Sequence, residues 1–125
     1  MSITNSLNVA VLGASKNPER YSFLATERLK EAGHKVYPVN PALDELLGVK
    51  VYHSLKDIPV AVDTLTVYVS PKHIEPMIEE IVSIKPKRVI LNPGAESLAL
   101  KVALKKSNIN YVEACTLVML STGRF

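Results

Sequence analysis

The sequence contains no tryptophan, and among its 125 residues there is a single cysteine, Cys115. One cysteine excludes an internal disulfide framework of the kind that holds small secreted proteins together. The chain also lacks an apolar run long enough to span a membrane, and its N-terminus lacks the basic and apolar segments of a signal peptide. We therefore expect a cytoplasmic protein with no membrane partner.

Strong charge of either sign is also missing. Lysine and arginine total 15 and aspartate and glutamate 12, so the net charge is +3, and the two signs are interspersed. A dedicated nucleic-acid-binding protein usually carries a basic block or stripe, which argues against nucleic acid as the partner. The mild positive charge suits a small anionic ligand. The length and the 47% apolar content predict one domain over residues 1–125 with a sizeable core.

Apolar runs alternate with helical patterns along the chain. Strands are expected at residues 8–12, 35–39, 64–69, 88–91 and 110–113, and helices at 22–32, 76–84 (after a short turn at 72–75), 96–106 and 114–122. Residues 41–59 are irregular, with a small extended segment at 48–52 and one helical turn at 54–58. Five strands alternating with helices predict an α/β fold, a three-layer sandwich with a mainly parallel five-stranded sheet. Pro38 indicates that the second strand lies at an edge or ends early.

Each of the first three predicted helices has an apolar face that should pack on the sheet. These faces are Leu24, Ala25, Leu29 and Ala32 in the first helix, Met77, Ile78, Ile81 and Val82 in the second, and Leu98, Val102 and Leu104 in the third.

Residues 8–22 organise the rest of the chain. An apolar run ends at Gly13, Ala14 and Ser15, and a polar loop then leads into the first helix. A strand that ends in glycine just before a helix is typical of the start of a phosphate-binding α/β domain. Gly13 permits a tight turn and the close approach of a ligand to the backbone. The helix behind it should direct unpaired N–H groups and the positive end of its dipole toward the loop.

Ligands of parallel sheets bind at the carboxyl ends of the strands. In this chain the loops at that edge are residues 13–21, 40–41, 70–73, 92–96 and 114–116. Ser70 and Pro71 have the character of a helix N-cap and first helical residue. Glycine, proline, asparagine and serine concentrate in these loops, which indicates a binding crevice. An alternative interpretation is that every α/β domain needs turns there.

A nicotinamide dinucleotide is the obvious ligand, but its signature is incomplete. Such a site usually has three glycines and an acid after the second strand. Here the loop has one glycine, and the position after the second strand is Asn40, followed by Pro41. Asn40 can still bond a hydroxyl or an adenine edge. Lys16 and Arg20 would add positive charge beside phosphates, although simple solvation of both side chains explains them equally well.

Several motifs in order resemble one family. They are Gly13-Ala14-Ser15, the Asn17-Pro18-x-Arg20-x-Ser22 segment, Val39-Asn40-Pro41, the Ser70-Pro71 loop, the Gly94 loop and the late Cys115. Over about residues 8–118 the chain resembles the small, stand-alone coenzyme A-binding proteins. These have a Rossmann-like fold related to the CoA-binding domain of succinyl-CoA synthetase alpha subunits.

The resemblance implies a role for each loop. Gly13, Ala14, Ser15 and Lys16 would meet the diphosphate of CoA together with Ser22, and Arg20 would neutralise phosphate. Val39, Asn40 and Pro41 would flank the adenosine, and Ser70, Pro71 and His73 would border the ligand across the crevice. Asn92, Pro93 and Gly94 would lie toward the pantetheine arm. Many relatives have a Gln-x-Gly-type loop at this last position, so the Asn-Pro-Gly sequence of this chain is a departure from the family pattern.

No catalytic constellation is visible. Cys115 follows the fifth strand, where either a mixed disulfide with the CoA thiol or a buried, inert thiol is expected. His34, His53 and His73 are far apart in the sequence, and no cluster has metal-ligand spacing. We therefore expect a non-catalytic module that binds or senses CoA or an acyl-CoA, with a homodimer or an unidentified protein as partner. The alternatives are an NAD(P)-binding oxidoreductase or redox sensor, a CoA-dependent enzyme using Cys115 or His73, and a protein-interaction domain.

Overall fold

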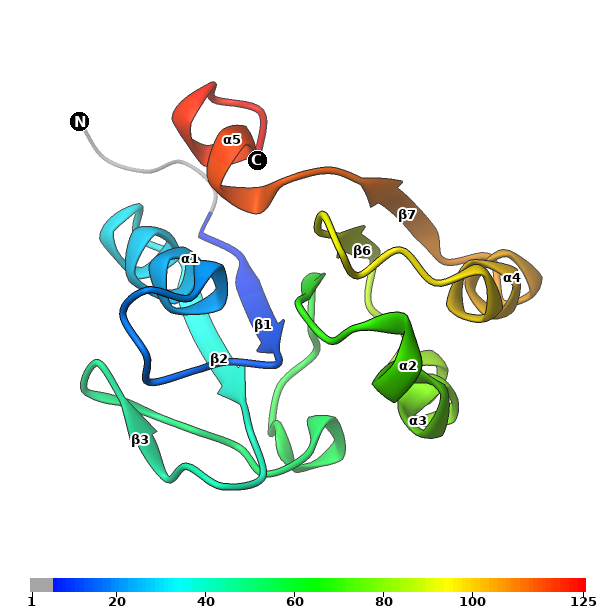
Figure 1. Cartoon of the computed structure of the whole chain (residues 1–125), viewed down its shortest axis with the longest axis horizontal. Helices are drawn as coiled ribbons and strands as arrows, with labels where there is room; N and C mark the ends of the chain where they lie inside the picture. The colour runs from blue at the N-terminus through cyan, green and yellow to red at the C-terminus, as the bar shows by residue number, and fades with distance from the viewer. Residues whose placement is uncertain (1–5) are drawn as a thin grey trace.

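The computed structural model describes residues 6–125, so the first five residues of the predicted domain lie outside the described part. Five strands form one sheet in the order β2-β1-β5-β6-β7, and every neighbouring pair is parallel. Their bounds are β1 (Asn8–Leu12), β2 (Lys35–Val39), β5 (Thr64–Val67), β6 (Arg88–Leu91) and β7 (Asn110–Glu113). The predicted α/β fold with a parallel five-stranded sheet is confirmed (Figure 1).

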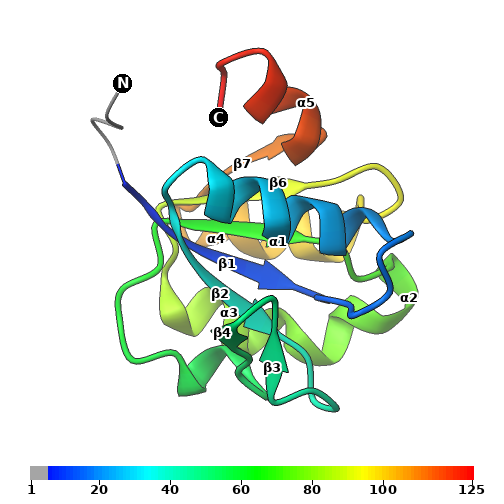
Figure 2. The ribbon, with the colours of Figure 1, turned by 90° about the vertical axis from the view of Figure 1, so that its left-hand side faces the viewer.

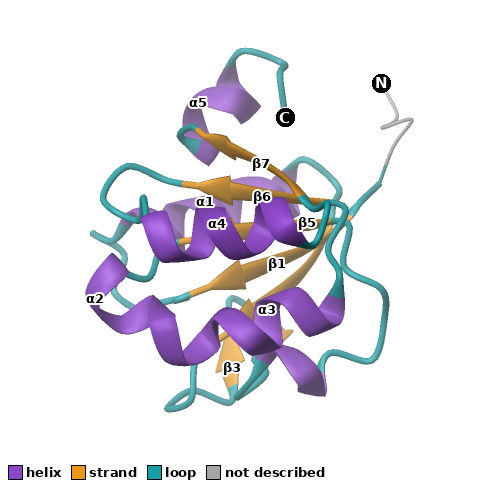
Figure 3. Ribbon diagram, turned by 90° about the vertical axis from the view of Figure 1, so that its right-hand side faces the viewer, coloured by secondary structure: helices purple, strands orange, loops and turns teal. Residues whose placement is uncertain are grey.

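Helices cover both faces of this sheet. On one face lies α1 (Tyr21–Glu31), which contacts the C-terminal helix α5 (Thr116–Ser121) (Figure 2). The opposite face carries α2 (Pro71–Ile74), α3 (Ile78–Ile84) and α4 (Leu98–Lys106) (Figure 3). Pro76 lies in a 3₁₀ turn, Glu75–Met77, which joins α2 to α3, because a proline inside a regular helix would remove a backbone hydrogen bond. The result is the expected three-layer arrangement.

The core follows the alternation of side chains along β1. Val9 and Val11 pack with Leu29 of α1, whereas Ala10 and Leu12 belong to the cluster on the α2–α4 face. Successive residues of a strand point to opposite faces, so a strand covered on both sides must be apolar throughout. This is why β1 was visible as an unbroken apolar run in the sequence.

Two predicted helix faces differ from those observed. Leu98 and Val102 of α4 are 74% and 48% exposed, while Leu100 and Leu104 are fully buried. The prediction was right for Leu104 and wrong for Leu98 and Val102. The helix starts at Leu98, and the side of it that faces the sheet carries Leu100 and Leu104, which are four residues apart. In α3 only Ile81 is buried.

The remaining differences are small. The predicted extended segment at 48–52 is part of a hairpin, β3 (Glu45–Leu46) and β4 (Val49–Lys50), and the helical turn after it is the 3₁₀ helix Leu55–Asp57. Strand β2 lies at one edge of the sheet, as Pro38 indicated. At the other edge all four residues of β7 are exposed. Within residues 6–125, none of the helices has the length and apolar character that crossing a membrane would require.

Candidate functional site

The loop after β1 is fixed by its neighbours. The N–H groups of Gly13 and Ala14 both donate to the carbonyl of Val39 at the end of β2, over 3.2 and 3.1 Å. Gly13 has a φ of +89°, and a Cβ added there would lie 3.1 Å from Val69 Cγ2 and 3.3 Å from the carbonyl carbon of Tyr68. Glycine is therefore required here by the turn and by close packing on the end of β5. Approach of a ligand, the reason expected from the sequence, is not needed to explain it.

Asn40, the residue after β2, braces the same loop. Its side-chain Nδ2 donates to the carbonyl of Ala14 over 2.7 Å, and its Oδ1 accepts from the N–H of Ala42, also over 2.7 Å. The Asn40 side chain thus holds the β1–α1 loop against the end of β2. Asn40 also lines a cavity at this edge of the sheet.

A cavity of about 440 Å³ lies between this loop, α1 and the ends of the strands. Helix α1 begins without a side-chain cap, and its N-cap residue Arg20 is extended. Among the described residues, the N–H groups of Ser15, Tyr21 and Ser22 donate to no backbone or side-chain acceptor. Ser22 is only 5% exposed, yet its hydroxyl forms no hydrogen bond with another described residue. The lining residues are Gly13, Ala14, Ser15, Arg20, Tyr21, Ser22, Asn40, Tyr68 and Pro93.

This first cavity can therefore accept an anion. Unpaired N–H groups and the positive end of the α1 dipole meet one wall of the cavity, and Arg20 lines it as well. An uncapped helix start beside a hydroxyl without a hydrogen bond leaves donors that a phosphate oxygen would satisfy.

A second cavity of about 390 Å³ adjoins the first. Tyr21, Tyr68 and Pro93 line both, so the two form one continuous crevice along the carboxyl edge of the sheet. The other residues of the second cavity are Asn92, Cys115, Leu117 and Val118. Its walls come from four separate segments of the chain. Three of the lining residues belong to α5 or directly precede it: Cys115, Leu117 and Val118.

Asn92 closes the base of the second cavity with a buried polar network. Its Nδ2 donates to Thr66 Oγ1 over 2.7 Å and to the Val67 carbonyl over 2.9 Å, and its Oδ1 accepts from the N–H of Thr116 over 2.9 Å. The Thr66 and Thr116 hydroxyls lie 2.8 Å apart and share a hydrogen bond. Each of these three side chains is 1% exposed or less. The network joins β5, β6 and the start of α5.

Tyr68 lies where the two cavities meet, since it lines both. Its hydroxyl is buried and satisfies no hydrogen bond among the described residues. Burial raises the pKa of Tyr68 to about 12, although the neighbouring Thr116 and Thr66 hydroxyls act in the opposite direction. The phenol is therefore neutral at physiological pH.

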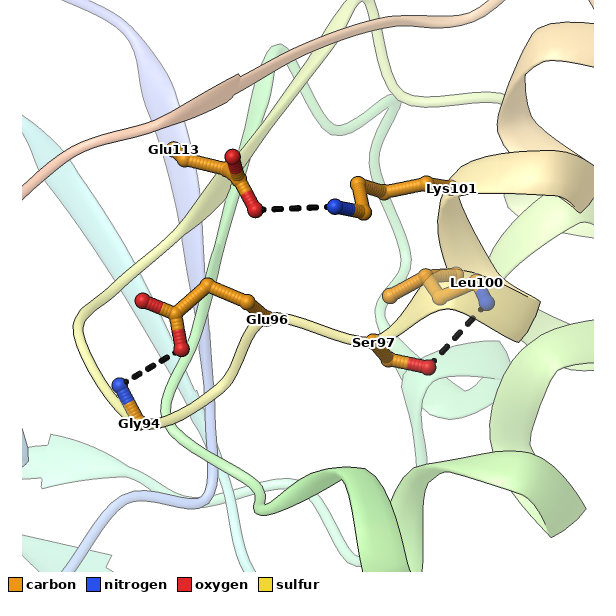
Figure 4. Close-up of polar contacts among 6 residues, drawn as sticks. All are labelled: Gly94, Glu96, Ser97, Leu100, Lys101 and Glu113. Atoms are coloured by element: carbon orange, nitrogen blue, oxygen red, sulfur yellow. Dashed lines mark hydrogen bonds and ion pairs between the residues drawn. The ribbon is translucent and has the colours of Figure 1, made fainter.

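The end of the loop after β6 and the elements that follow it are held by polar contacts (Figure 4). The N–H of Gly94 donates to Glu96 Oε1 over 2.9 Å, and Ser97 Oγ caps α4 by accepting from the N–H of Leu100 over 3.1 Å. Lys101 of α4 forms an ion pair with Glu113 of β7 at 3.0 Å. Pro93, directly before Gly94, lines both cavities.

Several residues that the sequence suggested for the site line neither cavity. Ser70 Oγ and His73 Nδ1 are 2.9 Å apart in the first turn of α2, which begins with the predicted Pro71. The other predicted site residues that line neither cavity are Lys16, Val39, Pro41 and Gly94. The structure brings together Gly13, Ala14, Ser15, Arg20, Ser22, Asn40 and Pro93 at the first cavity, and Asn92 with Pro93 at the second. In residues 6–125 there is no cluster of three or more His, Cys, Asp or Glu that would hold a metal ion.

Sequence reasoning missed the two tyrosines and the α5 side chains. Tyr68 was read as part of the third strand, which ends at Val67. Tyr21 was read as part of the loop, and it is 70% exposed at the mouth of both cavities. An aromatic residue at the carboxyl end of a buried parallel strand was the available signal, since ligands meet that edge.

The chain is similar to several known proteins. The family described as "CoA binding domain" matches residues 7–121. Uncharacterized protein YneT of Bacillus subtilis is 36% identical over 78 residues, which are 62% of this chain and 58% of that protein. The alpha subunit of ADP-forming acetate–CoA ligase II of Pyrococcus furiosus is 46% identical over 69 residues, 54% of this chain but 15% of the subunit.

A solved structure of an uncharacterized protein has a TM-score of 0.87 and 39% sequence identity, and the alignment covers 98% of this chain and all of that one. The chain thus spans less than two thirds of YneT and a small part of the ligase subunit. The family match extends over nearly every described residue, from the strand that starts the fold to the helix that ends it. The chain belongs to the CoA-binding domain family.

Proposed function

We propose that the chain binds coenzyme A or an acyl-CoA in the crevice formed by the two cavities, as a non-catalytic binding or regulatory module. The observation that carries this proposal is the uncapped start of α1, which faces a 440 Å³ cavity beside Arg20. Membership of the CoA-binding domain family and the likeness to an acetate–CoA ligase subunit support the same ligand.

The diphosphate is assigned to the first cavity. The Ser15, Tyr21 and Ser22 N–H groups and the Ser22 hydroxyl are the available donors, and the Arg20 guanidinium adds charge. Gly13 and Ala14 shape the loop, since their N–H groups are already bonded to Val39. Lys16, one residue beyond Ser15, extends the positive charge toward solvent.

The remaining contacts follow the direction of the crevice. Asn40 flanks the adenosine, with Val39 and Pro41 beside it. Ser70, Pro71 and His73 form the opposite border farther from the cavities. The pantetheine arm passes Tyr68 and Pro93 toward Asn92 and Gly94, because Tyr68 and Pro93 line both cavities.

The ligase activity of the relatives is not carried over to this chain, because the chain spans 15% of the ligase subunit it matches. The exposed Ser70 and His73 pair lines neither cavity. Cys115 lines the second cavity but belongs to no metal cluster within residues 6–125.

Titration calorimetry of the full chain under reducing conditions tests the ligand class. We expect binding of CoA and acetyl-CoA and much weaker binding of NADH and NADPH, since no acid follows β2 to accept the ribose hydroxyls. A preference for a nicotinamide nucleotide would favour the oxidoreductase or redox-sensor alternative. If none of the four ligands bound, the proposal would be rejected.

Substitution of Arg20 by alanine tests the position of the phosphates. We expect about a tenfold loss of CoA affinity, about 1.4 kcal/mol, and a weaker dependence on salt, since an exposed charged hydrogen bond is lost. Arg28→Ala is the matched control, because Arg28 is an exposed residue of the same helix that lines neither cavity. Equal effects of the two substitutions would contradict the assignment.

A further inference from the structure

The second cavity has apolar walls. Pro93, Cys115, Leu117 and Val118 line it together with the two tyrosines and Asn92, and no Asp, Glu, Lys, Arg or His is among the lining residues. The first cavity, in contrast, is lined by Arg20, two serines and Asn40. A ligand that enters both must therefore be polar at one end and apolar at the other.

The Asn92 amide in the second cavity is not available to a ligand. It is occupied by hydrogen bonds with Thr66, Val67 and Thr116, and the side chain is buried at the base. The Tyr68 hydroxyl is buried, without a hydrogen bond to another described residue. A charged group placed here would lose its water without gaining a charged partner, which is unfavourable.

The two cavities are continuous, because Tyr21, Tyr68 and Pro93 belong to both. A CoA whose diphosphate lies at the start of α1 would run past Tyr68 and Pro93 and end in the second cavity. We propose that this second cavity binds the acyl group of a short, apolar acyl-CoA, so that the protein prefers such thioesters to free CoA. This inference rests on the proposed function and adds the class of acyl group.

Burial of apolar carbon gives the expected size of the preference. Each buried methylene contributes about 0.8 kcal/mol, or about fourfold in affinity. The cavity of 390 Å³ accommodates several carbons beyond the thioester. From acetyl-CoA to butyryl-CoA, two methylenes longer, we therefore expect an affinity gain of roughly fifteenfold.

The first experiment is a titration series on the full chain with CoA, acetyl-CoA, butyryl-CoA, hexanoyl-CoA and succinyl-CoA. A reducing agent excludes a disulfide between the CoA thiol and Cys115. Affinity should rise from CoA to butyryl-CoA, and succinyl-CoA, which has the same four-carbon chain with a terminal carboxylate, should bind at least tenfold more weakly than butyryl-CoA.

The second experiment places the acyl group. Val118→Asp puts a carboxylate at the rim of the second cavity, where the 57% exposure of Val118 makes the substitution tolerable for folding. We expect the gain in affinity from acetyl-CoA to butyryl-CoA to disappear in this variant, whatever its affinity for free CoA. Val102→Asp is the matched control on α4, since Val102 is 48% exposed and lines neither cavity. If the Val118→Asp protein did not fold, Val118→Asn would serve in its place.

The outcomes separate the two proposals. Binding of CoA with a flat response to chain length would overturn the acyl pocket and leave the proposed function intact. Equal affinity for succinyl-CoA and butyryl-CoA, or an unchanged chain-length gain in Val118→Asp, would overturn it as well. Failure to bind any CoA compound would overturn both.

Discussion

Two helices, α1 and α5, start at the carboxyl edge of the sheet and contact each other, yet their first turns offer a ligand opposite chemistry (Figure 1). Helix α1 begins without a cap, and the N–H groups of Tyr21 and Ser22 remain unbonded within the described chain. At α5 the N–H of Thr116 is bonded to the buried side chain of Asn92. Both helix starts keep N–H groups without an acceptor among the described residues, at Leu117 and Val118 in α5 as well, but only the start of α1 has an arginine and serines beside them in its cavity.

The difference between the two helix starts shows how one edge of a sheet can bind both the polar end and the apolar end of one ligand. A helix start attracts phosphate only while its N–H groups are unsatisfied. At α5 an internal amide binds the first of these N–H groups, and the side chains that follow, Leu117 and Val118, form an apolar wall. The predictions below test the two regions separately, from the largest expected effect to the smallest.

A negative charge in the first cavity should have the largest effect. Ser15→Asp places a carboxylate beside the proposed diphosphate, and juxtaposed like charges cost several kcal/mol, so CoA affinity should fall about a hundredfold or more. The relative preference among acyl-CoAs should survive, since the second cavity is unchanged. Ser15→Ala, measured by the same titration, should lose much less. Wild-type affinity in Ser15→Asp would mean that the two regions are not divided as described.

Removal of the Asn92 amide should affect stability rather than phosphate binding. Asn92→Ala leaves the N–H of Thr116 without its partner in a buried site, and we expect a loss of about 2–3 kcal/mol in the free energy of unfolding in urea. Asn110→Ala, at an exposed position of β7, is the control and should change stability by less than about 0.5 kcal/mol. Similar values for both variants would show that the buried network is not what closes the start of α5.

The glycines of the two loops form a matched pair. Gly13 and Gly94 have φ of +89° and +91°, but only at Gly13 would a Cβ meet other atoms within 4 Å. Left-handed backbone costs a residue with a Cβ about 1–2 kcal/mol, so Gly94→Ala should lose about 1 kcal/mol and Gly13→Ala about 2 kcal/mol or more. Denaturant unfolding of both variants measures the difference. Equal losses would show that the crowding at Val69 is relieved at no cost.

Tyr68→Phe should have the smallest effect. The hydroxyl has no hydrogen bond, so its removal should change stability at pH 7 by less than about 0.5 kcal/mol. Because the folded protein holds the pKa of Tyr68 at about 12, the folded state keeps its proton where the unfolded state loses it. Stability should therefore fall as the pH rises from about 10 toward 12, and this part of the fall should be absent in Tyr68→Phe. An identical alkaline profile for both proteins would contradict the assignment.

Much of the fold was readable in advance. Four strands, β1, β2, β6 and β7, have the predicted bounds, because buried parallel strands appear as short runs of apolar and β-branched residues. The fifth, β5, ends two residues early, at Val67, and Tyr68, the residue after it, lines the crevice. Helix phase was harder to predict, and Leu98 and Val102 show why: both have the spacing of a buried face but point to solvent.

The first cavity was partly predictable because most of its residues belong to one continuous stretch, Gly13 to Ser22. A local segment carries its own signal, since the glycine turn and the start of the helix lie next to each other in the sequence. Which N–H groups of this loop remain available could not be predicted, because the bonds that occupy Gly13 and Ala14 come from Val39, on another strand.

The sequence by itself determined the strand order along the chain, the parallel α/β class and the phosphate-type loop, since each depends on neighbouring residues and their periodicity. Only the tertiary structure decided that the Asn92 side chain binds the Thr116 N–H and that Tyr21, Tyr68, Pro93 and Val118 line one apolar cavity. These residues come from four segments far apart in the chain. Their contacts exist only because the parallel strands bring their carboxyl ends to one edge.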